Sequence, residues 1–141
     1  MSFNNIFGVA GSALSAQMIR MNASASNMAN AGSTAPSEAE AFKAKRAVFQ
    51  TMLAEQQNDG QQPAVGGVRV VEITTDNTPN GKIHDPGNPN ADDDGFVYMS
   101  NVNEVTEMVE MMAAARSYQN NVEVVNTARQ LMMRTIEITK A

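Results

Sequence analysis

The sequence contains no cysteine and no tryptophan, and the missing cysteine excludes disulfides, a thiolate nucleophile and a thiolate metal site. No run of 18 apolar residues occurs, which argues against a transmembrane helix. The N-terminus lacks a basic segment ahead of an unbroken apolar stretch, so we expect no cleaved secretory signal. Basic residues cluster only at Lys43, Lys45 and Arg46 in a chain of formal net charge -5, which argues against a nucleic-acid partner.

Charge is nearly absent from the first 37 residues, in which Arg20 is the only charged side chain. Apolar residues still recur there in steps of three or four, the period of an amphipathic helix. They are Phe3, Phe7, Ala10, Leu14, Met18, Met21, Ala25 and Met28. We expect this helix to begin near Ser2 or Asn4 and to end between Ala29 and Gly32, where small turn-forming residues follow.

This first helix has weak intrinsic propensity, because Gly8, Gly11, Val9 and Ile19 all disfavour helix. Packing must therefore supply its stability, and we expect it to be poorly ordered in the isolated chain. The 11 methionines of the sequence are either core filler or a surface that repacks against non-identical neighbours.

A second apolar recurrence fills the C-terminal end, at Val102, Val105, Val109, Met112, Val122, Val125, Met132 and Ile136. Asn101 or Asn103 is the expected N-cap. Glu104, Glu107 and Glu110 come early and Arg129, Arg134 and Lys140 come late, which suits the helix dipole. A helix over 103–138 would be roughly 50 Å long. A compact domain of this size has a radius of gyration of only about 14 Å, so the helix is expected to pack on neighbouring molecules.

Turn-forming residues are concentrated between the two helices. Val68–Thr75 predicts a strand, Asn80-Gly81 predicts a hairpin turn, and Lys82–His84 would begin the return strand. Phe96–Met99 is expected to add a short third strand after a loop over Asp85–Gly95.

Two segments nearer the N-terminus are less clearly patterned. The composition of Glu38–Gln57 favours a helix, although an extended stretch is the alternative. Gln56–Gly67 is expected to be a surface loop.

The predicted fold is therefore mainly α with a small β insert. Residues 1–32 and 101–141 supply long terminal helices that pair as a coiled coil and form one axial core domain. Residues 33–100 form a middle segment with an extended or loop region and a small β-hairpin.

Two features suggest chemistry only weakly. Asn90, Asp92, Asp94 and Gly95 have calcium-loop spacing, but the position of the bidentate Glu is Asn101, so an acidic turn is the favoured interpretation. The single histidine precedes Asp85, but no nucleophile or oxyanion motif accompanies it, so a surface or turn role is favoured. We expect no catalytic, cofactor or metal site.

The candidate functional residues instead belong to the two apolar stripes and include the polar groups that interrupt them. We expect them to form a subunit interface. Arg116 and Tyr118 either edge the stripe or set the register with a neighbouring subunit, and the sequence favours neither reading. The predicted interface set is Phe7, Leu14, Met18, Met21, Met28, Val105, Val109, Met112, Arg116, Tyr118, Val122, Val125 and Met132.

Three motifs lie in order along nearly the whole chain. They are Asn22 with Ala25-Ser26-Asn27-Met28-Ala29-Asn30-Ala31, Asp85-Pro86-Gly87 followed by Ala91 and Gly95, and Arg116-Ser117-Tyr118-Gln119 with Asn121-Val122-Glu123-Val124. The three motifs resemble those of the flagellar basal-body rod proteins, and the middle one favours a proximal-rod member.

The resemblance implies a non-enzymatic subunit of the periplasm-spanning drive shaft that transmits torque. It implies export through the flagellar type III apparatus without a cleaved signal, and assembly with other rod proteins and components at the base of the basal body. The terminal helices would form the inner coiled-coil layer of a helical tube.

Three alternatives stay open at this point. The first is another flagellar axial protein, either a different rod subunit or a hook-junction component, which would share the terminal helices. The second is a small calcium-binding module built on the acidic loop. The third is an enzyme that uses His84 with Asp85.

Overall fold

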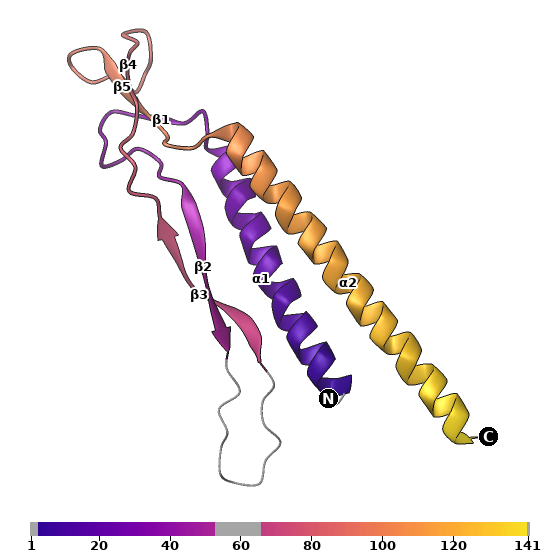
Figure 1. The fold of residues 1–141 in the computed structure, drawn as a ribbon. Helices are drawn as coiled ribbons and strands as arrows, with labels where there is room; N and C mark the ends of the chain where they lie inside the picture. Colours follow the sequence, from indigo (N-terminus) through magenta and orange to yellow (C-terminus); the bar gives the residue numbers. More distant parts are fainter. Residues whose placement is uncertain (1–2, 53–65, 141) are drawn as a thin grey trace, which may run out of the picture.

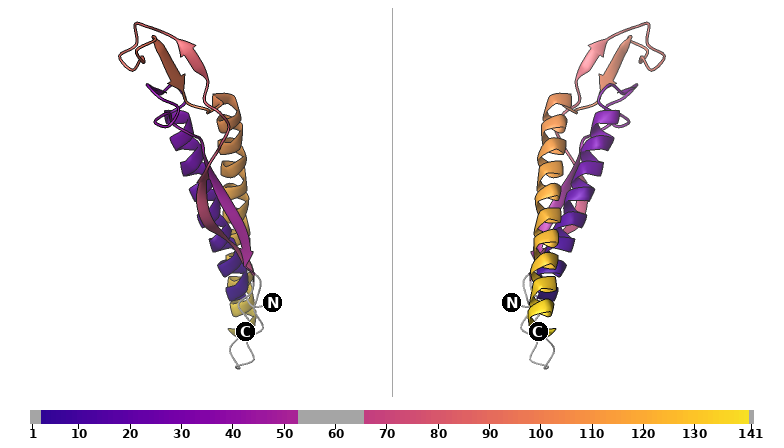
Figure 2. Two further views of the ribbon diagram at one scale, coloured as in Figure 1. Left: turned by 90° about the vertical axis from the view of Figure 1, so that its left-hand side faces the viewer. Right: turned by 90° about the vertical axis from the view of Figure 1, so that its right-hand side faces the viewer.

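The computed structural model describes residues 3–52 and 66–140 of the 141-residue chain. Its frame is a pair of long antiparallel helices, α1 (Phe3–Ala29) and α2 (Glu104–Lys140), that lie side by side (Figures 1 and 2). Their lengths of 27 and 37 residues correspond to about 40 and 55 Å, so α2 continues past the N-terminal end of α1 (Figure 1). Both helix predictions are confirmed.

The start of α2 is fixed by a capping residue. The Asn103 side-chain oxygen accepts a hydrogen bond from the Thr106 backbone N–H at 3.0 Å, which satisfies one of the free donors of the first turn. Glu104 and Glu107 lie in that same turn, where the helix dipole favours negative charge.

The middle of the chain forms two small sheets. Strands β2 (Lys45–Met52) and β3 (Gly67–Thr75) make a two-stranded antiparallel ribbon that packs along α1 (Figures 1 and 2). Beyond the helix ends, β1 (Thr34–Ala35), β5 (Phe96–Met99) and β4 (Lys82–His84) form an antiparallel sheet in the order β1-β5-β4. The strands expected at 68–75 and 96–99 are confirmed.

The expected helix over Glu38–Gln57 is wrong, since residues 45–52 form β2 and the extended alternative is the one found. In the described part of this segment, up to residue 52, helical geometry is limited to a single turn closed by the Ala41 N–H on the Ser37 carbonyl. The segment is extended despite its helix-favouring composition, because β2 is hydrogen-bonded along its length to β3. The loop expected at 56–67 lies, up to residue 65, outside the described residues.

The hairpin expected at Asn80-Gly81 is also wrong. Lys82–His84 is a strand, but it pairs with β5, while β3 pairs with β2. A type I′ turn needs positive φ at both central residues, and among the described residues Gly95 alone has positive φ. Asn80 instead is buried, and its side-chain amide donates to the carbonyls of Phe42 and Met99 at 3.0 and 2.7 Å.

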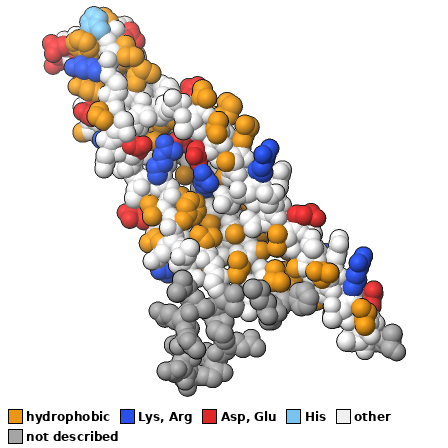
Figure 3. Space-filling view, viewed as in Figure 1, with side chains coloured by type: hydrophobic (Ala, Val, Ile, Leu, Met, Phe, Trp, Pro, Cys, Tyr) orange, Lys and Arg blue, Asp and Glu red, His pale blue; other side chains and the backbone are white. Residues whose placement is uncertain are grey.

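The interior of the folded chain is made mostly of alanine. Among the described residues, those that are buried and apolar are, apart from Val97, Ala10, Ala16, Ala23, Ala31, Ala35, Ala41, Ala44, Ala114 and Ala128. The largest fully buried side chains are polar, Glu107 and Asn27, whereas many large apolar side chains remain exposed, as the orange areas of Figure 3 illustrate. The helices thus approach each other through small residues and keep much of their large apolar surface outward. No described helix is apolar enough over a sufficient length to span a membrane.

Candidate assembly interface

The first turns of α2 carry an exposed apolar patch. Val105, Met108, Val109 and Met112, here called the outer α2 patch, have between 52% and 72% of their surface accessible. Their spacing places them on one helix face, while Glu107 and Ala114 on the opposite face are fully buried. Exposed apolar surface of this kind is common where one protein contacts another.

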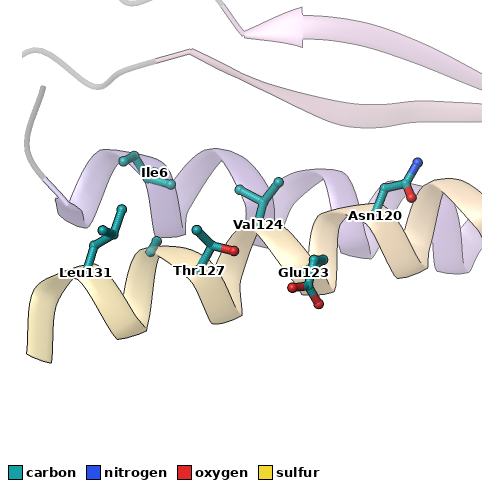
Figure 4. Close-up of a pocket in the computed structure, with 7 residues that line it drawn as sticks. Ile6, Asn120, Glu123, Val124, Thr127 and Leu131 are labelled. Atoms are coloured by element: carbon teal, nitrogen blue, oxygen red, sulfur yellow. The ribbon is translucent and has the colours of Figure 1, made fainter.

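Further along α2, an open groove of about 390 Å³ runs between the two helices near the start of α1. Val124 and Leu131 point from α2 towards α1, where Ile6 lies opposite, whereas Glu123 points away (Figure 4). Val124, Leu131 and Ile138 follow one another at intervals of seven residues, the repeat of a helix seam that receives a partner helix. This seam is only partly covered by α1, because Leu131 and Ile138 are 51% and 77% exposed.

A polar junction joins the helices to the middle segment. Asn27 of α1 is fully buried, and its side-chain amide donates to the Lys45 carbonyl at 2.9 Å while its oxygen accepts from the Lys45 N–H at 2.7 Å. The amide group therefore bonds to the edge of β2 as a neighbouring strand would.

Asn101, just before α2, also binds backbone groups through its side-chain amide. Its oxygen accepts from the Ala44 N–H at 2.7 Å, and its amide donates to the carbonyls of Asp76 and Thr78 at 3.1 and 2.8 Å. The side-chain amides of Asn27 and Asn101 thus satisfy backbone groups of two segments, 44–45 and 76–78, that are remote from each other in sequence.

Three ion pairs lie in the same region. Arg46 Nη1 of β2 lies 2.8 Å from Glu107 Oε1 of α2, and Arg46 Nε lies 3.8 Å from Asp76 Oδ2. Arg20 of α1 pairs with Glu110 of α2 across the helix contact.

Comparison with known proteins gives full-length matches. The chain is 50% identical over 138 residues to the flagellar basal-body rod protein FlgC of Yersinia enterocolitica and 45% identical over 138 residues to that of Salmonella typhimurium, and each alignment covers 98% of both chains. The chain belongs to the FlgC family of flagellar basal-body rod proteins. FlgC of Bacillus subtilis is 32% identical over 143 residues, which cover 94% of this chain and 95% of that one.

The profile of a broader family, described as the C-terminal region of flagellar basal body rod FlgEFG proteins, matches residues 93–138. These residues comprise β5 and nearly all of α2, including the outer α2 patch. The resemblance found in the sequence is thereby confirmed, and this FlgC-family chain is a structural flagellar protein rather than an enzyme.

The predicted interface residues fall into two groups in this FlgC-family structure. Those that are largely exposed are Met18, Val105, Val109, Met112 and Arg116. Those that are half-buried within the single chain are Phe7, Leu14, Met21, Met28, Tyr118, Val122, Val125 and Met132. The structure therefore does not bring the set onto one face, and its role as an interface stays a prediction.

Sequence reasoning missed Met108 of the outer α2 patch, which lies one position before a predicted residue and shares its face. It also missed Asn27, Asn101 and Glu107 as structural determinants. A signal was available for Asn27, since asparagine is unfavourable inside a helix and its presence there implies a specific hydrogen bond.

The acidic loop of this FlgC-family chain has the character of a turn. Asp92 accepts hydrogen bonds from the backbone N–H of Phe96 at 2.7 Å and of Asp94 at 3.1 Å. The Phe96 bond lowers the pKa of Asp92, with help from the Asp94 N–H and from Lys82. Asn90 donates to Thr34 instead, so the groups with calcium-loop spacing do not converge on one point.

The remaining candidate group, His84, is exposed on β4 and packs edge-to-face against the Phe96 ring with centroids 4.9 Å apart. Among residues 3–52 and 66–140, no three acidic or histidine side chains are grouped closely enough to hold a metal ion.

Proposed function

We propose that this structural rod subunit belongs to the proximal rod, and that it assembles through α1 and α2 into the periplasm-spanning shaft that transmits torque. In this proposal residues 1–32 and 101–141 act as one axial domain, and residues 33–100 are carried on it. Its partners are other copies of the chain, other rod proteins and components at the base of the basal body. The chain reaches the periplasm through the flagellar type III export apparatus, without a cleaved signal.

The observation that carries the proposal is the mismatch between the buried and the exposed apolar residues. Burying a large apolar side chain contributes about 1.5–3 kcal/mol, but within the described residues nine of the ten buried apolar side chains are alanines. The exposed large apolar residues of α2, such as Val105, Met112 and Ile138, gain this stabilisation only when another molecule covers them.

Coiled-coil pairing of the helices is part of the proposal. The contact of α1 with α2 along their lengths supports it, and so does the seven-residue repeat of Val124, Leu131 and Ile138. In the tube, the open side of this seam receives a helix of a neighbouring subunit.

The predicted interface set enters the proposal in two roles. Exposed members such as Val109 and Met112 contact neighbouring subunits directly. Half-buried members such as Leu14, Met21 and Val125 hold the helices in the arrangement that presents those contacts.

The proposal is tested by placing charges on the outer α2 patch. The double variant Val109→Asp/Met112→Asp should block rod assembly, because two carboxylates would have to be desolvated against a neighbour. The measurement is swimming in soft agar by a strain whose only copy of the gene encodes the variant, together with the amount of subunit exported to the medium.

The matched control is Ile83→Asp, which charges an apolar residue that is 48% exposed on β4, away from both the helices and the ribbon. It should swim normally. Normal swimming by the α2 double variant would show that this patch is not a subunit interface.

A further inference from the structure

The centre of the molecule holds a buried carboxylate. Glu107 is fully buried on the inward face of α2, and it and Asn27 are the largest such side chains in a core built mostly of alanine. Neither carboxylate oxygen accepts a hydrogen bond of normal geometry from a described residue. Its charge is balanced by the Arg46 guanidinium, 2.8 Å from Oε1, so the contact is an ion pair rather than a well-aligned hydrogen bond.

Such a pair is poorly suited to stabilising the fold. Desolvation of a carboxylate offsets most of the Coulombic attraction, and apolar side chains of similar volume often do equally well in the same place. The Arg46–Glu107 pair stabilises the fold less than most such pairs would, because the second carboxylate oxygen of Glu107 is buried and has no hydrogen-bond partner among the described residues.

The pair does have a distinctive position. Within the described residues, the backbone of the β2–β3 ribbon packs against α1 and not against α2. Arg46 reaches across from β2 to Glu107, so it ties the ribbon to the second helix as well.

Apart from this pair, the side-chain hydrogen bonds between the described strands of the ribbon and the helices come from α1. At one end Asn27 holds both backbone groups of Lys45, and at the other the Val68 N–H donates to Ser12 Oγ at 3.2 Å. Asn101, just before α2, holds the flanking backbone groups of Ala44 and Asp76. The Arg46–Glu107 pair is thus the described polar contact that ties the strands to α2 itself.

We infer that the Arg46–Glu107 pair is a positioning contact for rod assembly: it fixes the angle of the β2–β3 ribbon relative to the helix pair and contributes little to stability. This inference rests on the proposed function, since the angle matters because neighbouring subunits must fit around both parts. Charge-pair contacts of this kind specify one arrangement among several that apolar packing would allow.

The test replaces the pair by apolar groups in Arg46→Met/Glu107→Leu. We expect an unchanged urea unfolding midpoint but a loss of swimming. The conservative variant Arg46→Lys keeps a cation at the site and should still swim. Arg69→Met is the matched control, because Arg69 lies on the same ribbon and its hydrogen bonds to described residues go to the exposed Gln50.

The angle itself is measured by spin labels on introduced cysteines, which a cysteine-free chain makes straightforward. Ile73→Cys on the ribbon and Met133→Cys on α2 replace residues that are 51% and 55% exposed. The distance distribution should be narrow in the parent chain and broad in the apolar variant. Glu107→Gln, which keeps the shape but removes the charge, should broaden it as well.

The inference is overturned if the apolar variant swims normally and keeps a narrow distribution, or if it unfolds at much lower urea than the parent. Failure of the proposed function has a different signature. Val109→Asp/Met112→Asp should leave the distance distribution unchanged, so normal swimming by that variant would refute the interface while the spin-label result still decides the role of Arg46 and Glu107.

Discussion

Replacing Asn27 by alanine removes the side chain that joins α1 to the edge of β2. Asn27 is fully buried and makes two hydrogen bonds, of 2.9 and 2.7 Å, to the carbonyl and N–H of Lys45. Each such bond contributes about 1 kcal/mol net, and a buried group left without a partner costs about 1–3 kcal/mol. The helix propensity of alanine returns about 0.5 kcal/mol. We therefore expect Asn27→Ala to lower the free energy of unfolding by about 2–3 kcal/mol.

The assay is urea unfolding followed by circular dichroism at the helix band. Asn22→Ala is the control, because Asn22 lies on the same helix but is exposed, so the substitution should be neutral or stabilise by about 0.5 kcal/mol. Asn27→Asp keeps the acceptor, loses the donor and buries a charge, and it should cost more than Asn27→Ala. Equal unfolding free energies for the two alanine variants would refute the proposed role of Asn27.

Three further predictions concern the loops and the start of α2. Hydrogen bonds lower the pKa values of two carboxyl groups from 3.8: those from Thr78 act mainly on Asp76, and that from the Phe96 N–H acts mainly on Asp92. The stability that these carboxylates contribute is therefore present above about pH 4 and is lost as the pH falls through their lower pKa values in the folded state. Asp92→Asn should flatten this acid dependence in urea titrations at several pH values, and an unchanged slope would contradict it. Asn103→Ala removes the N-cap of α2 and should cost about 1 kcal/mol in the same assay, whereas no loss would argue against the cap. Gly95→Ala should lower the thermal midpoint, because Gly95 has φ of +78° and an added Cβ would lie 3.2 Å from His84 and Pro86; an unchanged midpoint would show that the turn tolerates a side chain.

Patterns within a short stretch of sequence were sufficient to predict those helices and strands whose conformation depends on nearby residues. The apolar period predicted α1 and α2, and the Asn103 cap and the early Glu residues located the start of α2. The β-branched run at 68–75 predicted β3 for the same reason.

Local patterns failed where distant groups decide the conformation. The 45–52 segment contains helix-favouring residues, yet it is extended because Asn27 and β3 bond its two edges. The Asn80-Gly81 pair has the sequence of a hairpin turn, but the Asn80 amide bonds Phe42 and Met99 instead. Neither partner can be identified from residues close in sequence.

The sequence also could not predict whether the apolar stripes face inward or outward. A stripe of valine and methionine normally marks the face that packs inward. Here Ala114 and Glu107 occupy the inward face of α2, and Val105 and Met112 face outward. This inversion follows from the close approach of two helices through small residues, and it leaves the large residues available for neighbouring molecules.

A density map of the intact basal body at side-chain resolution tests the interface on α2 most directly. This chain should lie in the rod, with Val105, Val109 and Met112 buried against helices of neighbouring subunits. If those three side chains faced solvent in the assembled rod, the assignment of the exposed face of α2 as the subunit interface would be contradicted.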